Sequence, residues 1–214
     1  MAVTPASLVN QALLKIGQTK LITSLTESST AAKAAATVFD TARDATLAAR
    51  WWPFAKKTAA LAQLNTTRKG WCYVYAPPAD MLVERELFRH SQEPPHLMEM
   101  QANDAGSGLV ICTDCPGAVL VYTQAITLLD AFPADVREAF VWKLAAELVL
   151  SLPVKPELRR VAMAEYEGAV SAAFARALNS TTEREPEKIS SFERARLSGR
   201  SRFRGPFGDD EETF

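Results

Sequence analysis

The sequence is poor in the residues that most proteins use for acid–base catalysis, disulfides or metal binding. Its 214 residues include three cysteines and two histidines, and an odd number of cysteines argues against a disulfide framework. No apolar run approaches the roughly 20 residues that a membrane-spanning helix needs, and the first residues lack the basic and apolar regions of a secretory signal. The formal net charge of −1 gives no bulk attraction to nucleic acid. We therefore expect a soluble protein that is made and used in a reducing, intracellular compartment.

The short motifs of common active sites are also missing. The sequence has no Gly-x-Ser-x-Gly elbow, no phosphate-binding glycine loop and no His-Glu-x-x-His motif. Cys112 and Cys115 have the spacing of half a zinc site, which Cys72, His90 and His96 could complete. Only one regular pair is present, and Cys115 precedes Pro-Gly, so an ordinary hairpin with buried cysteines is the favoured interpretation. We expect no enzyme activity, no cofactor and no metal.

Glu84 and Glu86 are the carboxylates that come nearest to a catalytic pair. They lie two residues apart in a predicted strand, so we expect them on the same face of a sheet. Paired carboxylates at a suitable separation hydrolyse glycosides. The same alternation also describes a solvated sheet face, and no other member of a catalytic set accompanies the pair. A hydrolase therefore stays an alternative interpretation.

Four segments have the periodicity of helices. The first begins at Thr4-Pro5, where threonine can cap the helix and proline fits its first position, and it ends near Gly17. A second, alanine-rich segment covers about 28–50. A third begins after Pro133 with an apolar residue at every fourth position, and a fourth covers about 157–178. These segments predict a bundle of about four helices.

Between the second and third helices the sequence breaks into short β-prone runs separated by turn residues. The predicted strands are Thr58–Leu64, Trp71–Tyr75, Leu82–Phe88, Leu97–Gln101, Leu109–Cys112 and Ala118–Gln124. The predicted fold class is α+β, mainly a helical bundle with a small inserted antiparallel β subdomain and an extended C-terminal arm. The bundle takes residues 1–55 and 127–178, the insert 56–126 and the arm 179–214.

The arm has few aliphatic residues and cannot bury enough surface to fold alone. Its charges are sorted, with arginines first and acidic residues last, and phenylalanines are spaced through it. The residues predicted to bind a partner are Arg194, Arg196, Arg200, Arg202, Phe203, Arg204 and Phe207. Isolated aromatics on such an arm are typical of docking anchors, so we expect an arm that is disordered when free and orders on docking. Binding of nucleic-acid phosphates by the same arginines stays open.

Several blocks occur in an order that resembles the head-to-tail adaptor family of tailed bacteriophages, which includes tail tubular protein A and the head completion or tail accessory factors. The blocks are Arg50–Ala55, Leu61–Leu64, Trp71–Tyr75, Pro77–Leu82, Leu109–Asp114, Leu120–Tyr122, and Ala131–Phe140 with Leu144–Leu148. The resemblance covers about residues 4–178 and rests on the order and spacing of the blocks. Within the first block, Trp51-Trp52-Pro53-Phe54 is expected to fill the seam between two layers, and an exposed recognition patch is the alternative.

The resemblance implies a structural, non-enzymatic virion protein. Members of the family form dodecameric rings beneath the portal protein, link it to the tail nozzle or tail tube, help to retain packaged DNA and leave a channel for DNA ejection. The expected partners are therefore further copies of the chain, the portal, the nozzle or tube protein and the DNA in the channel, with no membrane span. The expected location is the neck of the virion, after synthesis in the host cytoplasm, and the arm would dock to the portal. The alternatives are a tail-associated peptidoglycan hydrolase and a DNA-binding module that uses the arginines of the arm.

Overall fold

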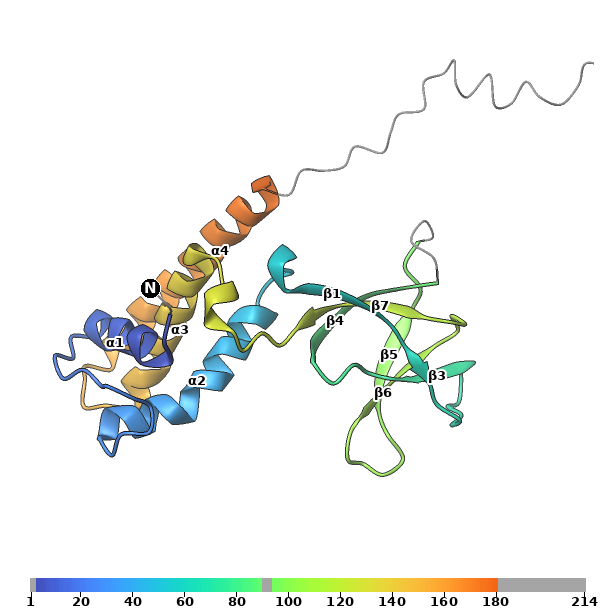
Figure 1. Cartoon of the computed structure of the whole chain (residues 1–214), viewed down its shortest axis with the longest axis horizontal. Helices are drawn as coiled ribbons and strands as arrows, with labels where there is room; N and C mark the ends of the chain where they lie inside the picture. The colour runs from blue at the N-terminus through green and yellow to red at the C-terminus, as the bar shows by residue number, and fades with distance from the viewer. Residues whose placement is uncertain (1–2, 90–93, 181–214) are drawn as a thin grey trace, which may run out of the picture. The chain divides into compact units, whose positions relative to one another are not determined.

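Four helices and seven strands make up the part of the chain that the computed structural model describes, residues 3–89 and 94–180 (Figure 1). The helices are α1 (Pro5–Lys15), α2 (Thr30–Ala48), α3 (Ala134–Ser151) and α4 (Glu157–Ser180). The strands are β1 (Lys56–Ala60), β2 (Ala62–Gln63), β3 (Tyr73–Ala76), β4 (Met81–Phe88), β5 (Met98–Ala102), β6 (Leu109–Thr113) and β7 (Val119–Gln124). Short 3-10 helices at Pro53–Ala55 and Leu129–Ala131 lie where the chain leaves the helices and returns to them.

The strands lie close to the predicted runs, but they form two sheets and not a small insert. Helices hold 45% of the described residues and strands hold 21%, so the prediction of a mainly helical bundle with a small β insert was wrong. The protein is an α+β fold with two antiparallel sheets. The prediction failed because local sequence locates strands but reveals little of the long-range pairing that joins them into two sheets with a core of their own.

Capping side chains set the beginnings of the first two helices. The Thr4 hydroxyl accepts a hydrogen bond from the backbone N–H of Ser7 at 3.2 Å, and the Ser7 hydroxyl accepts one from the N–H of Thr4 at 3.2 Å. This reciprocal arrangement satisfies two donors that a helix end leaves unpaired, and it starts α1 where the sequence predicts. Ser29 caps α2 by accepting a hydrogen bond from the N–H of Ala32 at 3.3 Å.

Helix α3 is the centre of the helical part and packs against α1, α2 and α4. Its buried side chains are Val136, Ala139, Phe140, Val141, Leu144, Ala145, Ala146, Leu148 and Val149. They cover most of the circumference of the helix, as expected for a helix with neighbours on several sides. Phe140 packs edge-on against Phe39 of α2, with 5.2 Å between the ring centroids. No helix in the described ranges has the length and apolarity needed to cross a membrane.

The two sheets pack around a core of their own. One sheet has the strand order β1-β7-β4 and the other has the order β2-β3-β6-β5. The chain passes from the edge of the first sheet to the edge of the second at Leu61, whose N–H donates to the carbonyl of Ala118 at 2.9 Å. The core between the sheets takes side chains from both, among them Tyr75, Leu87, Ile111, Leu120 and Tyr122. Burial of these side chains gives the β part a hydrophobic core between its two sheets.

Arg85 of β4 joins the first sheet to the end of α2. Its guanidinium donates to the Thr123 hydroxyl of β7 at 2.9 Å, to the carbonyl of Arg50 at 3.0 Å and to that of Ala48 at 3.4 Å. The last carbonyls of a helix have no partners within the helix, and a cation near them is favourable. Burial lowers the pKa of Arg85, and the nearby carboxylate of Glu84 opposes this change. Arg85 therefore connects the helices and the sheets by one side chain.

Replacement of Arg85 by methionine should destabilise the protein, because the carbonyls of Ala48 and Arg50 lose their donor. A hydrogen bond that involves a charged group contributes about 1.5–3 kcal/mol, and we expect a loss in that range in the free energy of urea unfolding. The matched control is Arg89→Met, which removes an exposed arginine just beyond the end of the same strand. Equal stability of the two variants would contradict this role for Arg85.

Candidate assembly surface

The residues predicted to bind a partner lie outside the described residues. Arg194, Arg196, Arg200, Arg202, Phe203, Arg204 and Phe207 all follow Ser180, the last residue that the structure describes. Their role stays a prediction. The other candidate residues belong to the helices and sheets, where their surroundings decide what they can do.

The two carboxylates of β4 do not form a pair. Glu84 lies opposite Tyr122 of β7, and Glu86 lies opposite Val121, because a bulge at Arg85 shifts the register between them. Val121 and Tyr122 are consecutive residues of one strand, so they point to opposite faces of the sheet, and residues that are paired across strands share a face. Glu84 and Glu86 therefore point to opposite faces. The prediction that Glu84 and Glu86 share a face of the sheet was wrong. The hydrolase alternative needs two carboxylates on one face, and these two residues do not provide that arrangement.

Asp80 connects the turn before β4 to β1 and β7. Its carboxylate binds Lys57 Nζ at 2.6 Å and accepts a hydrogen bond from the Tyr122 hydroxyl at 2.9 Å. Its backbone carbonyl accepts a hydrogen bond from the N–H of Ala125 at 2.8 Å. The Lys57 ammonium, and after it the Tyr122 hydroxyl, holds the pKa of Asp80 below its ordinary value. These partners give Asp80 a structural role.

The cysteines do not gather into a metal site. Cys112 and Cys115 are buried in different apolar clusters. Cys72 is exposed, and a hydrogen bond with the carboxylate of Asp114 raises the pKa of its thiol. Among the described residues no group of three or more Cys, His, Asp and Glu side chains could hold a metal ion, and His90 is not among them. The prediction that both cysteines are buried was confirmed, but the predicted hairpin was wrong, because β6 and β7 on either side of Cys115 belong to different sheets.

Trp52 fills the seam between the end of α2 and the last turns of α4. Its side chain is fully buried, and its indole N–H donates to the backbone carbonyl of Thr46 at 2.9 Å. The ring packs edge-on against Phe174 of α4, with 5.8 Å between centroids, and against Phe54 at 6.1 Å. Trp52 therefore fills a seam between two packed elements, as the sequence predicts. The neighbouring residues Trp51 and Phe54 are half-buried.

One side of α4 is open to solvent. The side that packs on the rest of the protein buries Ala162, Tyr166, Val170 and Ala173, whereas Val161 is 49% exposed. Arg159 and Arg160 are exposed in the first turn of α4, where the positive end of the helix dipole disfavours cations. Neither guanidinium forms an ion pair with another described residue. Glu157 is the acidic residue of the same turn, where the helix dipole favours a carboxylate.

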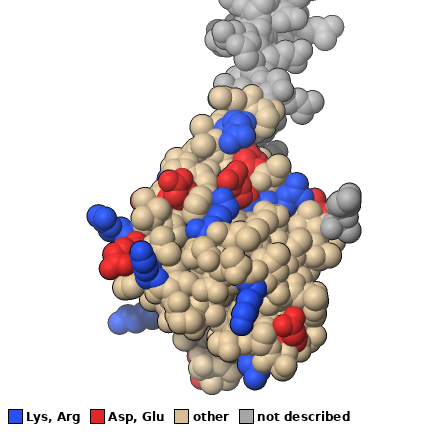
Figure 2. Space-filling view, turned by 90° about the vertical axis from the view of Figure 1, so that its left-hand side faces the viewer, with Lys and Arg blue, Asp and Glu red and all other residues tan. Residues whose placement is uncertain are grey.

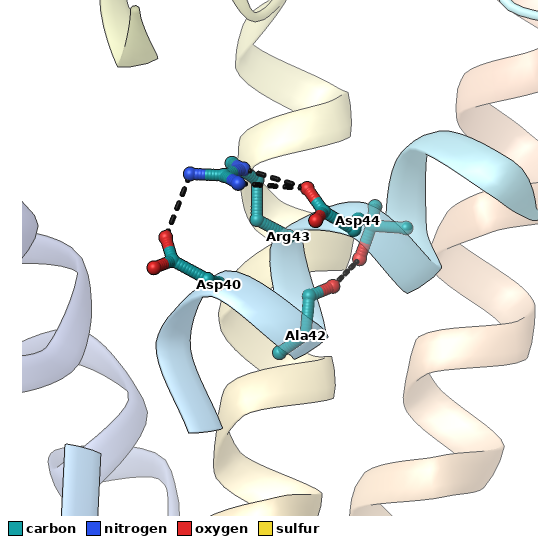
Figure 3. Close-up of polar contacts among 5 residues, drawn as sticks. Asp40, Ala42, Arg43 and Asp44 are labelled. Carbon is teal, nitrogen blue, oxygen red and sulfur yellow. Dashed lines mark hydrogen bonds and ion pairs between the residues drawn. The ribbon is translucent and has the colours of Figure 1, made fainter. Parts of the chain in front are cut away.

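The outer side of α2 carries an ion-pair network with an excess of negative charge. Arg43 Nη1 lies 2.7 Å from a carboxylate oxygen of Asp40, and Arg43 Nη2 lies 2.8 Å from one of Asp44 (Figure 3). Two carboxylates and one guanidinium leave a net charge of about −1 at neutral pH. The side chain of Asp40 is 75% exposed and that of Arg43 is 11% exposed, so this network presents mainly its acidic groups to solvent.

Uncharged residues cover most of the face of the molecule at its helical end. Figure 2 shows this face with positive and negative side chains interspersed among uncharged ones. A large field of one sign, which would attract the phosphates of DNA, is not visible on it.

Asp40 and Arg160 were not among the predicted site residues. The sequence carries a signal for each, namely an arginine between two acids on one helix and two arginines in the first turn of another. Which side of each helix stays open depends on the packing around α3, and periodicity alone does not provide that.

Asp80→Asn should lower the urea midpoint of unfolding at neutral pH, because the amide cannot hold the Lys57 ammonium. Folding lowers the pKa of this carboxylate, so its charged form stabilises the folded protein at any pH above the ordinary pKa of an aspartate. This stabilisation is lost as the pH falls from the ordinary pKa to the lower pKa of the folded protein. The difference between wild type and Asp80→Asn should therefore shrink once the pH falls below 3.8, the ordinary value. Urea midpoints measured from pH 7 down to pH 2 check this, with Glu165→Gln, an exposed carboxylate of α4, as the control. A difference that does not change with pH would contradict it.

No family model matches this sequence, and no curated protein sequence matches it. The function is therefore inferred from the motifs and the geometry of the chain itself.

Proposed function

We propose that this chain is the structural, non-enzymatic subunit of a ring that joins the portal to the tail of a tailed bacteriophage. The observation that carries the proposal is the ordered series of blocks over residues 4–178 that resembles the head-to-tail adaptors. In this role the ring sits in the neck of the virion, helps to retain packaged DNA and leaves an axial channel for its ejection. The chain is made in the host cytoplasm.

The placement of the blocks supports a likeness of architecture. The block Arg50–Ala55 contains the buried Trp52 and the carbonyl that Arg85 binds, so it forms the junction between helices and sheets. The block Pro77–Leu82 contains Asp80, which holds the turn before β4. The block that begins at Ala131 leads into the central helix α3. Residues at such positions specify a fold, and the likeness therefore concerns the architecture of the chain.

A closed ring requires two different sides on each subunit, because each copy meets its neighbour head to tail. The helical part has two candidates in the outer side of α2 and the open side of α4. Both sides expose charges of both signs, with Lys33 and Asp40 on α2 and Arg160 and Glu167 on α4. They are two different surfaces, as a head-to-tail contact requires.

The arm at residues 179–214 is proposed to dock to the portal. Its arginines would pair with carboxylates of the portal, and Phe203 and Phe207 would be the apolar anchors. Many weak contacts to one ring-shaped partner add up by multivalency. The competing proposal is binding of DNA by the same arginines, which would weaken steeply as the salt concentration rises.

Deletion of residues 181–214 should abolish stable binding to portal rings, because each copy loses its charged and aromatic anchors. Binding is measured by co-sedimentation with portal rings, and circular dichroism checks that the shortened protein stays folded. The matched pair of full-length variants replaces Phe203 and Phe207 by alanine in one protein, and Asp209 and Asp210 by asparagine in the other. We expect weaker binding for the first and unchanged binding for the second. Unchanged binding after the deletion would contradict the role of the arm.

A further inference from the structure

Strands β1 and β5 are the two regular edges of the β part. β1 is an edge of the first sheet and β5 is an edge of the second. Each strand is five residues long and pairs with its inner neighbour without a break in register. The other two edges differ, because β4 contains two irregularities in its register and β2 has two residues. A regular edge strand can pair with a strand of another molecule.

The register of β1 shows which of its backbone groups are free. The N–H of Leu61 donates to the carbonyl that precedes β7, and this pair continues the register of β1 with β7. Bonded pairs alternate along an antiparallel ladder, so the even-numbered residues of β1 point their N–H and C=O groups outward. The N–H of Lys56 is taken by the carbonyl of Pro53. The carbonyl of Lys56 and both groups of Thr58 and Ala60 have no hydrogen-bond partner among the described residues.

The free groups of β5 follow from its pairing with β6. The N–H of Asn103 donates to the carbonyl that precedes β6, so the even-numbered residues of β5 point their backbone groups outward. The carbonyl of Ala102 accepts a hydrogen bond from Arg68 Nη2 at 3.0 Å. The N–H of Ala102 and both groups of Met98 and Met100 have no hydrogen-bond partner in the part of the chain that the structure describes.

The free groups of the two strands are complementary in one antiparallel register. When Thr58 of one copy lies opposite Met100 of another, Ala60 lies opposite Met98. Each of these pairs can exchange two hydrogen bonds, because all four residues point their N–H and C=O groups outward. This register therefore satisfies all the free groups of the four residues.

The third pair of this register fits the hydrogen bonds that each chain already makes. Lys56 lies opposite Ala102, and the two groups that would face an occupied partner are the two that are occupied themselves. The two remaining groups, the carbonyl of Lys56 and the N–H of Ala102, form a further hydrogen bond. Beyond the ladder both edges end, since the N–H of His96 is bonded to the carbonyl of Leu87 and β1 leaves its sheet at Leu61.

An exposed apolar side chain lies next to this ladder. Leu97 is 83% exposed, the highest value among the large apolar residues that the structure describes. In the same register it lies opposite Leu61, which is half-buried. Opposed side chains on one face of an antiparallel pair are in contact, so the pairing would cover Leu97.

The edge formed by β1 has one unneutralised positive charge. Lys57 binds the carboxylate of Asp80. Lys56 lies over the ring of Trp51, with 5.2 Å between Nζ and the ring centroid, and forms no ion pair with a described residue.

The edge formed by β5 has one unneutralised negative charge. Glu99 is the charged residue of β5 and accepts a hydrogen bond from Trp71 Nε1 at 3.2 Å. Arg68 and Asp104, beside the end of the strand, form an ion pair with each other. In the proposed register Glu99 lies diagonal to Lys57 of β1, within reach of its long side chain. Two copies of β5 paired through the free groups of their methionines would place Glu99 opposite Glu99, which is unfavourable.

We propose that β1 of one copy pairs with β5 of the next copy in the ring. The three-stranded sheet of one subunit and the four-stranded sheet of its neighbour then form one continuous sheet. The contact joins two different strands, so it repeats head to tail. The proposal rests on the proposed function, in which copies of the chain stand side by side in a ring.

The test is a pair of cysteines across the ladder, in the full-length chain with Cys72→Ser. Ala59 and Glu99 lie opposite each other at a position without backbone hydrogen bonds, where Cα atoms are about 4.5 Å apart and a disulfide fits. Rings of Ala59→Cys/Glu99→Cys on portal rings are treated with oxidised glutathione and analysed on a denaturing gel without reductant. We expect linked chains beyond the dimer, because each copy is joined to two neighbours.

The matched control is Ala59→Cys/Ala102→Cys, whose cysteines lie on the same two strands but on opposite faces of the ladder. We expect it to give no links above the level of Cys72→Ser alone.

A second pair of variants blocks the ladder. Thr58→Pro and Ala102→Pro each remove an outward N–H that has no partner in its own chain, and we expect complete rings on portals to fall at least about tenfold. Gln63→Pro is the control, because the N–H of Gln63 also points outward from an edge strand. It should assemble to within about threefold of wild type. Urea unfolding of each free variant checks that the fold is kept.

Rings of the Ala59→Cys/Glu99→Cys protein that give no links would overturn the contact and leave the proposed function standing. Assembly unaffected by Thr58→Pro and Ala102→Pro would have the same meaning. Portals that stay bare with wild-type protein would overturn the proposed function. Oxidation of the cysteine pair in the free protein then decides the contact, since linked chains support pairing of the two strands and unlinked chains overturn it.

Discussion

The structure depends on the junction at which the chain leaves the helices for the sheets. Arg85 reaches from β4 to the last carbonyls of α2 and to Thr123 of β7, so one guanidinium satisfies groups on both sides. Trp52 closes the same junction from the helical side by filling the space between α2 and α4. Without these two side chains, the end of α2 would present unpaired carbonyls and a cavity to the sheets. The outer sides of α2 and α4 keep their positions because this junction and the central helix α3 hold them.

The helices could be predicted from the sequence because their signals are local. Thr4 and Pro5 specify the start of α1, and the fourfold spacing after Pro133 specifies α3. The strands were located approximately, but their importance was underestimated. β1 pairs with β7, which lies more than fifty residues later in the chain. A short stretch of sequence does not predict which distant strand it will pair with. The resulting fold has two sheets with their own core instead of a small insert.

The candidate sites show the same division between local and long-range information. The buried position of Trp52 follows from the size of the side chain and its place at the end of a helix. The separation of Glu84 and Glu86 follows from a bulge opposite β7, which alternation along β4 does not reveal.

The most direct test of the central claim is to mix the purified full-length protein with the portal rings that the proposed function requires as its partner. The mass of the complex and images of single particles are then recorded. The proposed function predicts a second ring on each portal, with a fixed copy number that the mass provides. Portals that stay bare, while the added protein is folded by circular dichroism, would contradict it.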